Sequence, residues 1–265
     1  MYVPCTPHTP GHAIGAAVLA YHDDPQPRRN RCSTVQTPYL GSTILSGELP
    51  DRILGTGLYE LQVCNGGACT HAARLVSRGL ILAWIQGRGE FAPQSLGNRS
   101  IIADPRRAEL RGRLQSLSPK LEDTPLPRLS VLHEYGPDCF DHFQVSPYME
   151  RTLQPRLKVV RRVPGVSSRD SVVKINTVKR DRNEHFYELI FCFYRLGGIP
   201  MIVNLDCGFR GRRFVKTAED ILSVLSTRGV DAIFVDDLMV WRKHLDIAVD
   251  QHSPVLNRQE REAMQ

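Results

Sequence analysis

The stretch Gln86–Ser100 gathers several side chains that could do chemistry. Arg88, Glu90, Asn98 and Arg99 bring two cations, an acid and an amide into one glycine-containing segment. Guanidinium groups bind carboxylates and phosphates through paired N–H donors. We therefore expect Arg88, Asn98 and Arg99 either to bind an anionic group or to fix a loop by hydrogen bonds. Glu90 is expected to act as a base or, in preference, as a partner for Arg99.

Two other groups of residues could bind or react. Arg212 lies in the run 210–213, which holds three arginines and is either an anion site or a solvated basic loop. His8 and His12 could bind a metal or act as a base, although a lone histidine in a loop usually does neither.

Composition narrows the function classes. All but six of the 34 basic residues are arginine, and the net charge is +6. The arginines are scattered and no aromatic-basic motif accompanies them, so nucleic-acid binding is not expected. The seven cysteines form no CxxC pair and are expected to be reduced thiols. No apolar run is long enough for a membrane span and the N-terminus does not resemble a signal peptide, so we expect a cytoplasmic protein without membrane contact.

The elements that must position these residues follow from hydrophobic periodicity and from Gly and Pro. Helices are predicted over 11–20, 70–79, 105–117, 186–196 and 217–227, the last with Thr217 as N-cap. Strands are predicted over 80–85, 101–103, 157–163, 171–178, 201–205 and 231–235. Their irregular alternation predicts an α+β protein with a mixed, twisted sheet and flanking helices.

The stretch Gln86–Ser100 resembles the signature of the O-carbamoyltransferases of natural-product and nodulation-factor biosynthesis, which reads roughly QGRMEFGPRALGNRS. Four further segments resemble the same family in order: 146–149, 164–178, 186–190 and 204–220. The resemblance implies the C-terminal, YrdC-like part of these enzymes, where carbamoyladenylate is made from carbamoyl phosphate and ATP.

The resemblance also implies a domain division. Val3–Ala20 resembles the end of the family's N-terminal ASKHA-type domain, which binds a metal and transfers the carbamoyl group. We expect residues 1–62 to be a remnant of that domain with a linker, 63–250 to be the YrdC-like domain, and 251–265 to be a flexible tail. A separate subunit is expected to supply the missing N-terminal half.

Aligned positions extend the candidate site and also depart from the family. His12 stands where the family has a metal-ligand Asp, and it remains able to bind a divalent metal. Lys120 is the one cation kept from the family's phosphate loop, and Lys174 replaces an arginine. Asn204 matches a polar family position, whereas Asp206 could orient or deprotonate a substrate amine, or pair with Arg212. Gln94 replaces the signature's middle arginine.

Three functions remain open. The first is a carbamoyltransferase-like subunit in bacterial secondary metabolism that acts on a small amine- or hydroxyl-bearing substrate with an anionic group. The second is a scaffold that displaces or eliminates a sulfate or phosphate leaving group without ATP, for example by closing a small ring. The third is a non-catalytic partner that stabilises a biosynthetic enzyme. ATP and carbamoyl phosphate are implied only if the ancestral chemistry survives.

Overall fold

The computed structural model describes residues 4–7, 9–24, 37–44, 49–92, 94–117, 128–166, 172–208, 215–227, 229–245 and 247. These residues form one mixed sheet in the order β1-β9-β8-β2-β3-β7-β4-β6-β5. The strands are β1 (Tyr59–Val63), β2 (Leu82–Ile85), β3 (Arg99–Ala103), β4 (Arg128–Leu132), β5 (Arg151–Leu153), β6 (Val173–Val178), β7 (Met201–Asp206), β8 (Ala232–Val235) and β9 (Leu238–Arg242). The pairs β2/β8 and β4/β6 are parallel and the other pairs are antiparallel.

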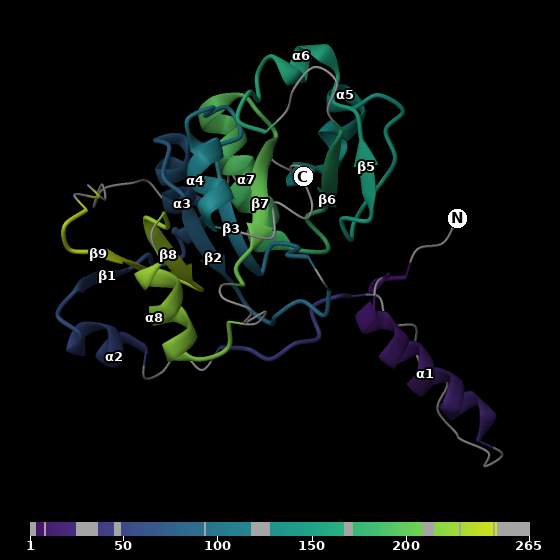
Figure 1. Cartoon of the computed structure of the whole chain (residues 1–265), viewed down its shortest axis with the longest axis horizontal. Helices are drawn as coiled ribbons and strands as arrows, with labels where there is room; N and C mark the ends of the chain where they lie inside the picture. The colour runs from purple at the N-terminus through teal and green to yellow at the C-terminus, as the bar shows by residue number, and fades with distance from the viewer. Residues whose placement is uncertain are drawn as a thin grey trace.

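Helices flank this sheet, as the α+β prediction requires (Figure 1). They are α1 (Thr9–Asp23), α2 (Leu49–Gly55), α3 (Ala68–Ser77), α4 (Leu110–Leu117), α5 (Gly136–Cys139), α6 (Leu157–Val160), α7 (Glu184–Gly197) and α8 (Ala218–Ser226), with a 3₁₀ turn η2 (His133–Tyr135). Thr217 caps α8 as predicted, in a reciprocal capping box with Asp220. None of the described helices is long and apolar enough to cross a membrane.

The prediction of a strand over 157–163 is wrong, because α6 lies there. Its valines favour a strand by propensity alone. However, Val159 and Val163 are four residues apart and both are buried, so a helical turn places them together on the core. Tertiary packing therefore overrides the local preference.

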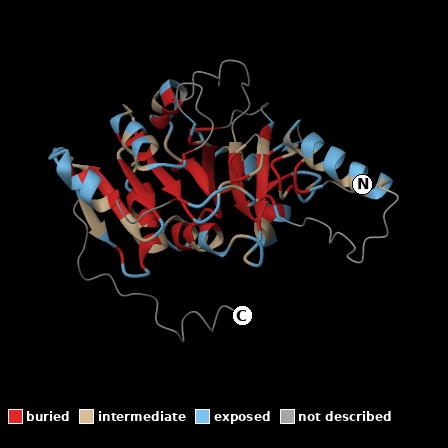
Figure 2. Cartoon of the chain, turned by 90° about the horizontal axis from the view of Figure 1, so that it is seen from below, coloured by how far each residue is buried: buried red, intermediate tan, exposed pale blue. Residues whose placement is uncertain are grey.

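The core lies along the strands, whereas α1 stands apart (Figures 1 and 2). Leu19 on α1 is 63% exposed, and the burial colours show the helix as almost entirely accessible. In contrast, Leu49 and Ile53 of α2 are fully buried in the main core.

The predicted domain boundary between residues 62 and 63 falls inside β1, which pairs with β9 along its full length. We therefore propose that the sheet domain begins no later than α2. The division into a remnant and a YrdC-like domain stays a prediction, and the proposed tail 251–265 lies outside the described residues.

A second, smaller core fastens the N-terminal segments to the sheet domain. It contains Cys5, Leu96, Tyr148 and Met149, with Tyr39 packed against them. Residues from four distant parts of the sequence therefore meet here, and one of them, Leu96, belongs to the stretch Gln86–Ser100.

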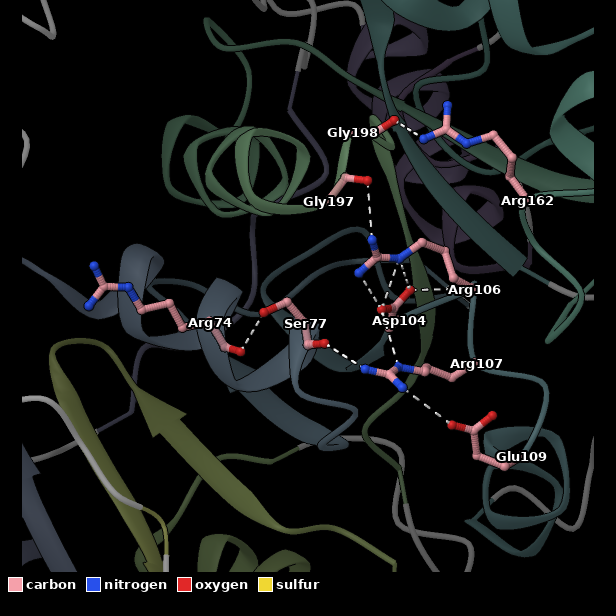
Figure 3. A network of polar contacts seen from close by, with 9 residues as sticks. All are labelled: Arg74, Ser77, Asp104, Arg106, Arg107, Glu109, Arg162, Gly197 and Gly198. Carbon is pink, nitrogen blue, oxygen red and sulfur yellow. Dashed lines mark hydrogen bonds and ion pairs between the residues drawn. The ribbon is translucent and has the colours of Figure 1, made fainter.

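Arginines close the C-terminal ends of α3 and α7 (Figure 3). The Arg107 guanidinium donates to the carbonyl oxygen of Ser77 (3.0 Å), and that of Arg106 donates to Gly197 (3.1 Å). Both cations gather around the carboxylate of Asp104, whose side chain is fully buried. Cations at helix C-termini satisfy the last carbonyls and oppose the negative end of the dipole.

We predict that Asp104→Asn lowers the free energy of unfolding by about 2–3 kcal/mol, because it removes the buried charge that orders two arginines. Urea denaturation measures this change. The matched control is Glu109→Gln, whose carboxylate is 67% exposed and 3.7 Å from Arg107. Such an exposed pair contributes less than about 1 kcal/mol. Equal effects of the two substitutions would contradict this role of Asp104.

Candidate functional site

The signature loop, defined as residues 86–98, connects β2 to β3 and is seated against α7. At Gly97 the backbone has φ of 109°, and an added Cβ would overlap the ring of Phe186. Only glycine combines this conformation with so close an approach. The start of α7 therefore fixes where the loop can lie.

The carboxylate of Glu90 organises the loop from inside. Its Oε1 accepts hydrogen bonds from the backbone N–H groups of Leu96 (3.1 Å), Asn98 (2.6 Å) and Arg99 (3.0 Å). Burial raises the pKa of the Glu90 carboxyl, and these amides act in the opposite direction. Since one oxygen already binds three loop amides, we assign Glu90 to holding the loop and not to proton transfer.

The guanidinium of Arg99 also holds the loop through backbone groups. Its donors bind backbone carbonyl oxygens of Gln86 (2.7 Å), Asn98 (2.7 Å), Gly87 (2.9 Å), Val215 (3.1 Å) and Ser42 (3.3 Å). A guanidinium has five N–H donors, so none is left over. Burial lowers the pKa of Arg99, and the opposite charge of Glu90 counteracts that effect.

Asn98 and Arg88 tie the loop to its neighbours. The Asn98 amide donates to the carbonyl oxygen of Arg88 (2.7 Å) and accepts from the amide of Asn183 (2.9 Å), the N-cap of α7. The exposed Arg88 guanidinium donates to the carbonyl oxygens of Leu40 (3.1 Å) and Gly41 (2.9 Å). Each side chain makes contacts that shape the loop.

These contacts favour the loop-fixing role of Arg88, Asn98 and Arg99 over the anion-binding role. The anion-binding role stays a prediction. Arg99 could reach an anion only by abandoning buried carbonyl groups, which is costly.

A polar face of the sheet lies next to the loop. On β4, β6 and β7, alternate side chains are polar: Arg128 and Ser130, Lys174 and Asn176, Asn204 and Asp206. In the register, Arg128 is paired with Lys174 and Ser130 with Asn176. Alternation along a strand places such residues on one face, so the three strands present one continuous polar surface.

Asp206 joins the loop to this face. Its Oδ1 accepts from the backbone N–H of Ser95 (2.7 Å), and its Oδ2 lies 2.6 Å from a guanidinium nitrogen of Arg128. The expected partner, Arg212, lies outside the described residues. Both oxygens of Asp206 are thus engaged, and its carboxylate orients Arg128.

Lys174 is the cation at the centre of this cluster. Burial lowers its pKa, and the nearby charge of Arg128 lowers it further, whereas Asp206 and Glu150 oppose both effects. A half-buried ammonium beside a second cation is a favourable place for an anion, because the anion relieves both repulsion and desolvation.

A buried acceptor on this face lacks a hydrogen-bond partner among the described residues. Asn204 donates to Ser95 O (3.0 Å) and to Ser130 Oγ (2.9 Å), yet its Oδ1 has no hydrogen-bond partner among the described residues. The same holds for Oε1 of Gln94 and for Oγ of Ser100. Buried polar atoms of this kind call for a ligand or an ordered water.

The remaining predicted residues are not brought to this face. His12 lies exposed on α1, and in the described part of the chain no three His, Cys, Asp or Glu side chains are grouped as a metal site. His8 and Lys120 lie outside the described residues. Cys207 is buried, and burial raises the pKa of its thiol to about 12, which disfavours the nucleophilic thiolate.

None of the strands predicted from the sequence contains Arg128, so its place on this face was missed. The signal was present in the alternation Arg128-Leu129-Ser130-Val131, which is typical of a strand with one polar face. The same alternation occurs in Lys174-Ile175-Asn176.

We predict that Arg99→Lys lowers the free energy of unfolding by at least about 2 kcal/mol, because three ammonium donors cannot replace five and leave carbonyl groups unpaired. Thermal denaturation and faster amide exchange within residues 86–99 would report it. Arg88→Lys is the control, with an expected change below about 1 kcal/mol. Unchanged stability with weakened phosphate binding would instead restore the anion role of Arg99.

Comparison with known proteins identifies the family of this chain. The nodulation protein NolNO of Sinorhizobium fredii is 29% identical over 248 residues, which are 92% of this chain and 36% of that protein. The 3'-hydroxymethylcephem-O-carbamoyltransferase of Amycolatopsis lactamdurans is 26% identical over 62% of this chain and 31% of that enzyme. The HypF structure of T. kodakarensis aligns with 70% of this chain and 23% of its own at 15% identity, with a TM-score of 0.43.

The chain thus spans about a third of the length of these two relatives. A family model described as the carbamoyltransferase C-terminus matches residues 73–242, which is more than half of the chain and covers β2 to β9. The chain belongs to the carbamoyltransferase family, in the part formed by its C-terminal domain.

Proposed function

We propose that the chain is a carbamoyltransferase-like subunit of a heteromeric biosynthetic enzyme, acting on a small amine- or hydroxyl-bearing substrate with an anionic group. One observation carries the proposal: Lys174 and Arg128 lie on the same polar face as Asn204, whose buried Oδ1 has no partner among the described residues. Membership of the carbamoyltransferase family supports it.

The chemistry of this face suits a carbamoyl group attached to a phosphate. Amide oxygens accept from the N–H₂ of a carbamoyl group, and ammonium and guanidinium groups neutralise a phosphate. In this proposal Asn204 and Gln94 orient the carbamoyl end, Lys174 binds the phosphate, and Asp206 positions Arg128 through their 2.6 Å ion pair.

The charge balance favours a second candidate function as well. Among the described residues, the two cations of this face meet two acids, Asp206 and Glu150. Such a site suits one sulfate or phosphate better than the triphosphate of ATP. A substrate amine would then attack the carbon that bears the ester, the C–O bond would break, and the sulfate or phosphate would leave with the electron pair. The amine proton would pass to solvent.

We predict that Lys174→Gln weakens binding of carbamoyl phosphate and of sulfate by about tenfold, since truncating one partner of a half-buried charge pair removes at least about 1.4 kcal/mol. Calorimetric titration measures this, with Lys158→Gln on the exposed face of α6 as control. Wild-type binding should weaken as pH rises through a pKa below the usual lysine range, because Lys174 then loses its charge.

The ligands separate the two functions. Binding of both ATP and carbamoyl phosphate supports carbamoyladenylate formation, whereas binding of sulfate without ATP supports displacement of a leaving group. If none of these anions binds the wild-type chain, both proposals fail and a non-catalytic partner role takes their place.

We also propose a separate subunit that supplies the function of the part of the relatives that this chain does not match. The exposed helix α1 supports this, because Leu19 and its neighbours have no covering element among the described residues. Leu19→Glu should abolish co-purification with that subunit, whereas Leu196→Glu on α7, 52% exposed, should not. If this chain alone, as a monomer, catalysed the reaction, the proposal of a separate subunit would be rejected.

A further inference from the structure

A cavity of about 350 Å³ opens beside the signature loop and adjoins the cationic face only at Asn176. Its wall is formed by the segment 37–39, by Leu96, by the turn 147–148 and by residues 176–183. Lys174, Arg128 and Asp206 do not line it. The volume suits a molecule of about one ring with its substituents, at the lower end of ligand pockets.

Tyr39 forms the buried floor of this cavity, and its hydroxyl already has two hydrogen-bond partners. The Tyr39 hydroxyl donates to the carbonyl oxygen of Leu96 (3.0 Å) and accepts from the Asn183 amide (3.0 Å). Burial raises the pKa of Tyr39 well above its usual value, so the phenol stays neutral. Hydrogen bonds to a ligand therefore have to come from the rim, and the floor offers aromatic surface.

The rim is cationic. Exposed Lys179 and Arg182 face one acid, Asp181, among the residues that line the cavity. Arg182 also donates to the Tyr148 hydroxyl (3.1 Å), which joins a cation to the second aromatic residue of the wall. Aromatic walls with a cationic rim are suited to a flat, apolar body that bears one negative group.

We propose that this cavity is a second binding site, for a small molecule that combines a flat ring with one carboxylate or phosphate group. The site depends on Tyr39, Tyr148, Lys179 and Arg182 and not on the cluster around Lys174. It goes beyond the proposed function, since it holds whether the ligand is the acceptor substrate or an effector.

The test uses phenyl phosphate and benzoate as probes, titrated into the full chain by calorimetry, with inorganic phosphate and cyclohexanecarboxylate for comparison. Phenyl phosphate and benzoate should bind more tightly than their partners without a flat ring. The double variant Lys179→Gln/Arg182→Gln should weaken binding of both by at least about fivefold, as expected for two rim charges. These residues are exposed, and circular dichroism checks that the variant is folded.

Two variants separate this site from the cationic face. Tyr148→Leu should weaken binding of benzoate, while Lys174→Gln should leave benzoate binding unchanged, because Lys174 does not line the cavity. The second site is overturned if Lys174→Gln loses benzoate binding while the Lys179→Gln/Arg182→Gln variant binds benzoate as tightly as the wild type. No binding of either ring-bearing probe at millimolar concentration overturns it as well, and leaves the proposed function to its own anion titrations.

Discussion

The arrangement of the site depends on one pair of buried charges that act on backbone groups. Glu90 accepts from three amides and Arg99 donates to five carbonyls, so one acid and one cation satisfy eight backbone groups in and around a long connection that has no regular secondary structure. Buried backbone groups need partners, and a loop between two strands has few of its own. Because the contacts of Arg99 reach Ser42 and Val215, this pair also sets where two distant segments meet the sheet.

The loop is joined to the polar face through the backbone of Ser95, whose carbonyl oxygen also accepts from Asn204. Ser95 donates from its backbone to Asp206, Asp206 pairs with Arg128, and the charge of Arg128 acts on Lys174. Through these contacts Ser95 of the loop affects the position of charges beside Lys174 on β6. The signature loop therefore holds the polar side chains in position, whereas the strands carry the side chains that would contact a ligand.

Hydrophobic periodicity was sufficient to predict the mixed sheet, the capping of α8 and most elements, because burial and caps depend on local pattern. It failed at α6, where the packing of Val159 and Val163 against the core decides the structure. The function of Arg99 could not be read in the same way. A guanidinium has the same donors for a phosphate and for a carbonyl, and only the three-dimensional position of the carbonyls distinguishes the two. The position of Arg128 on a strand could have been predicted, since its alternation with apolar neighbours is visible in the sequence.

The second core has a consequence for how this protein can be divided. A fragment that starts at α2 would keep every strand that the structure describes and all of the main core except Ile44. It would lose Ser42, whose carbonyl binds Arg99, and also the carbonyls of Leu40 and Gly41 that bind Arg88. Tyr39, which packs against Leu96 and Tyr148, would go with them. A fragment cut at the edge of the sheet would therefore lack contacts that hold the signature loop, so the loop and not the sheet sets where a fragment should begin.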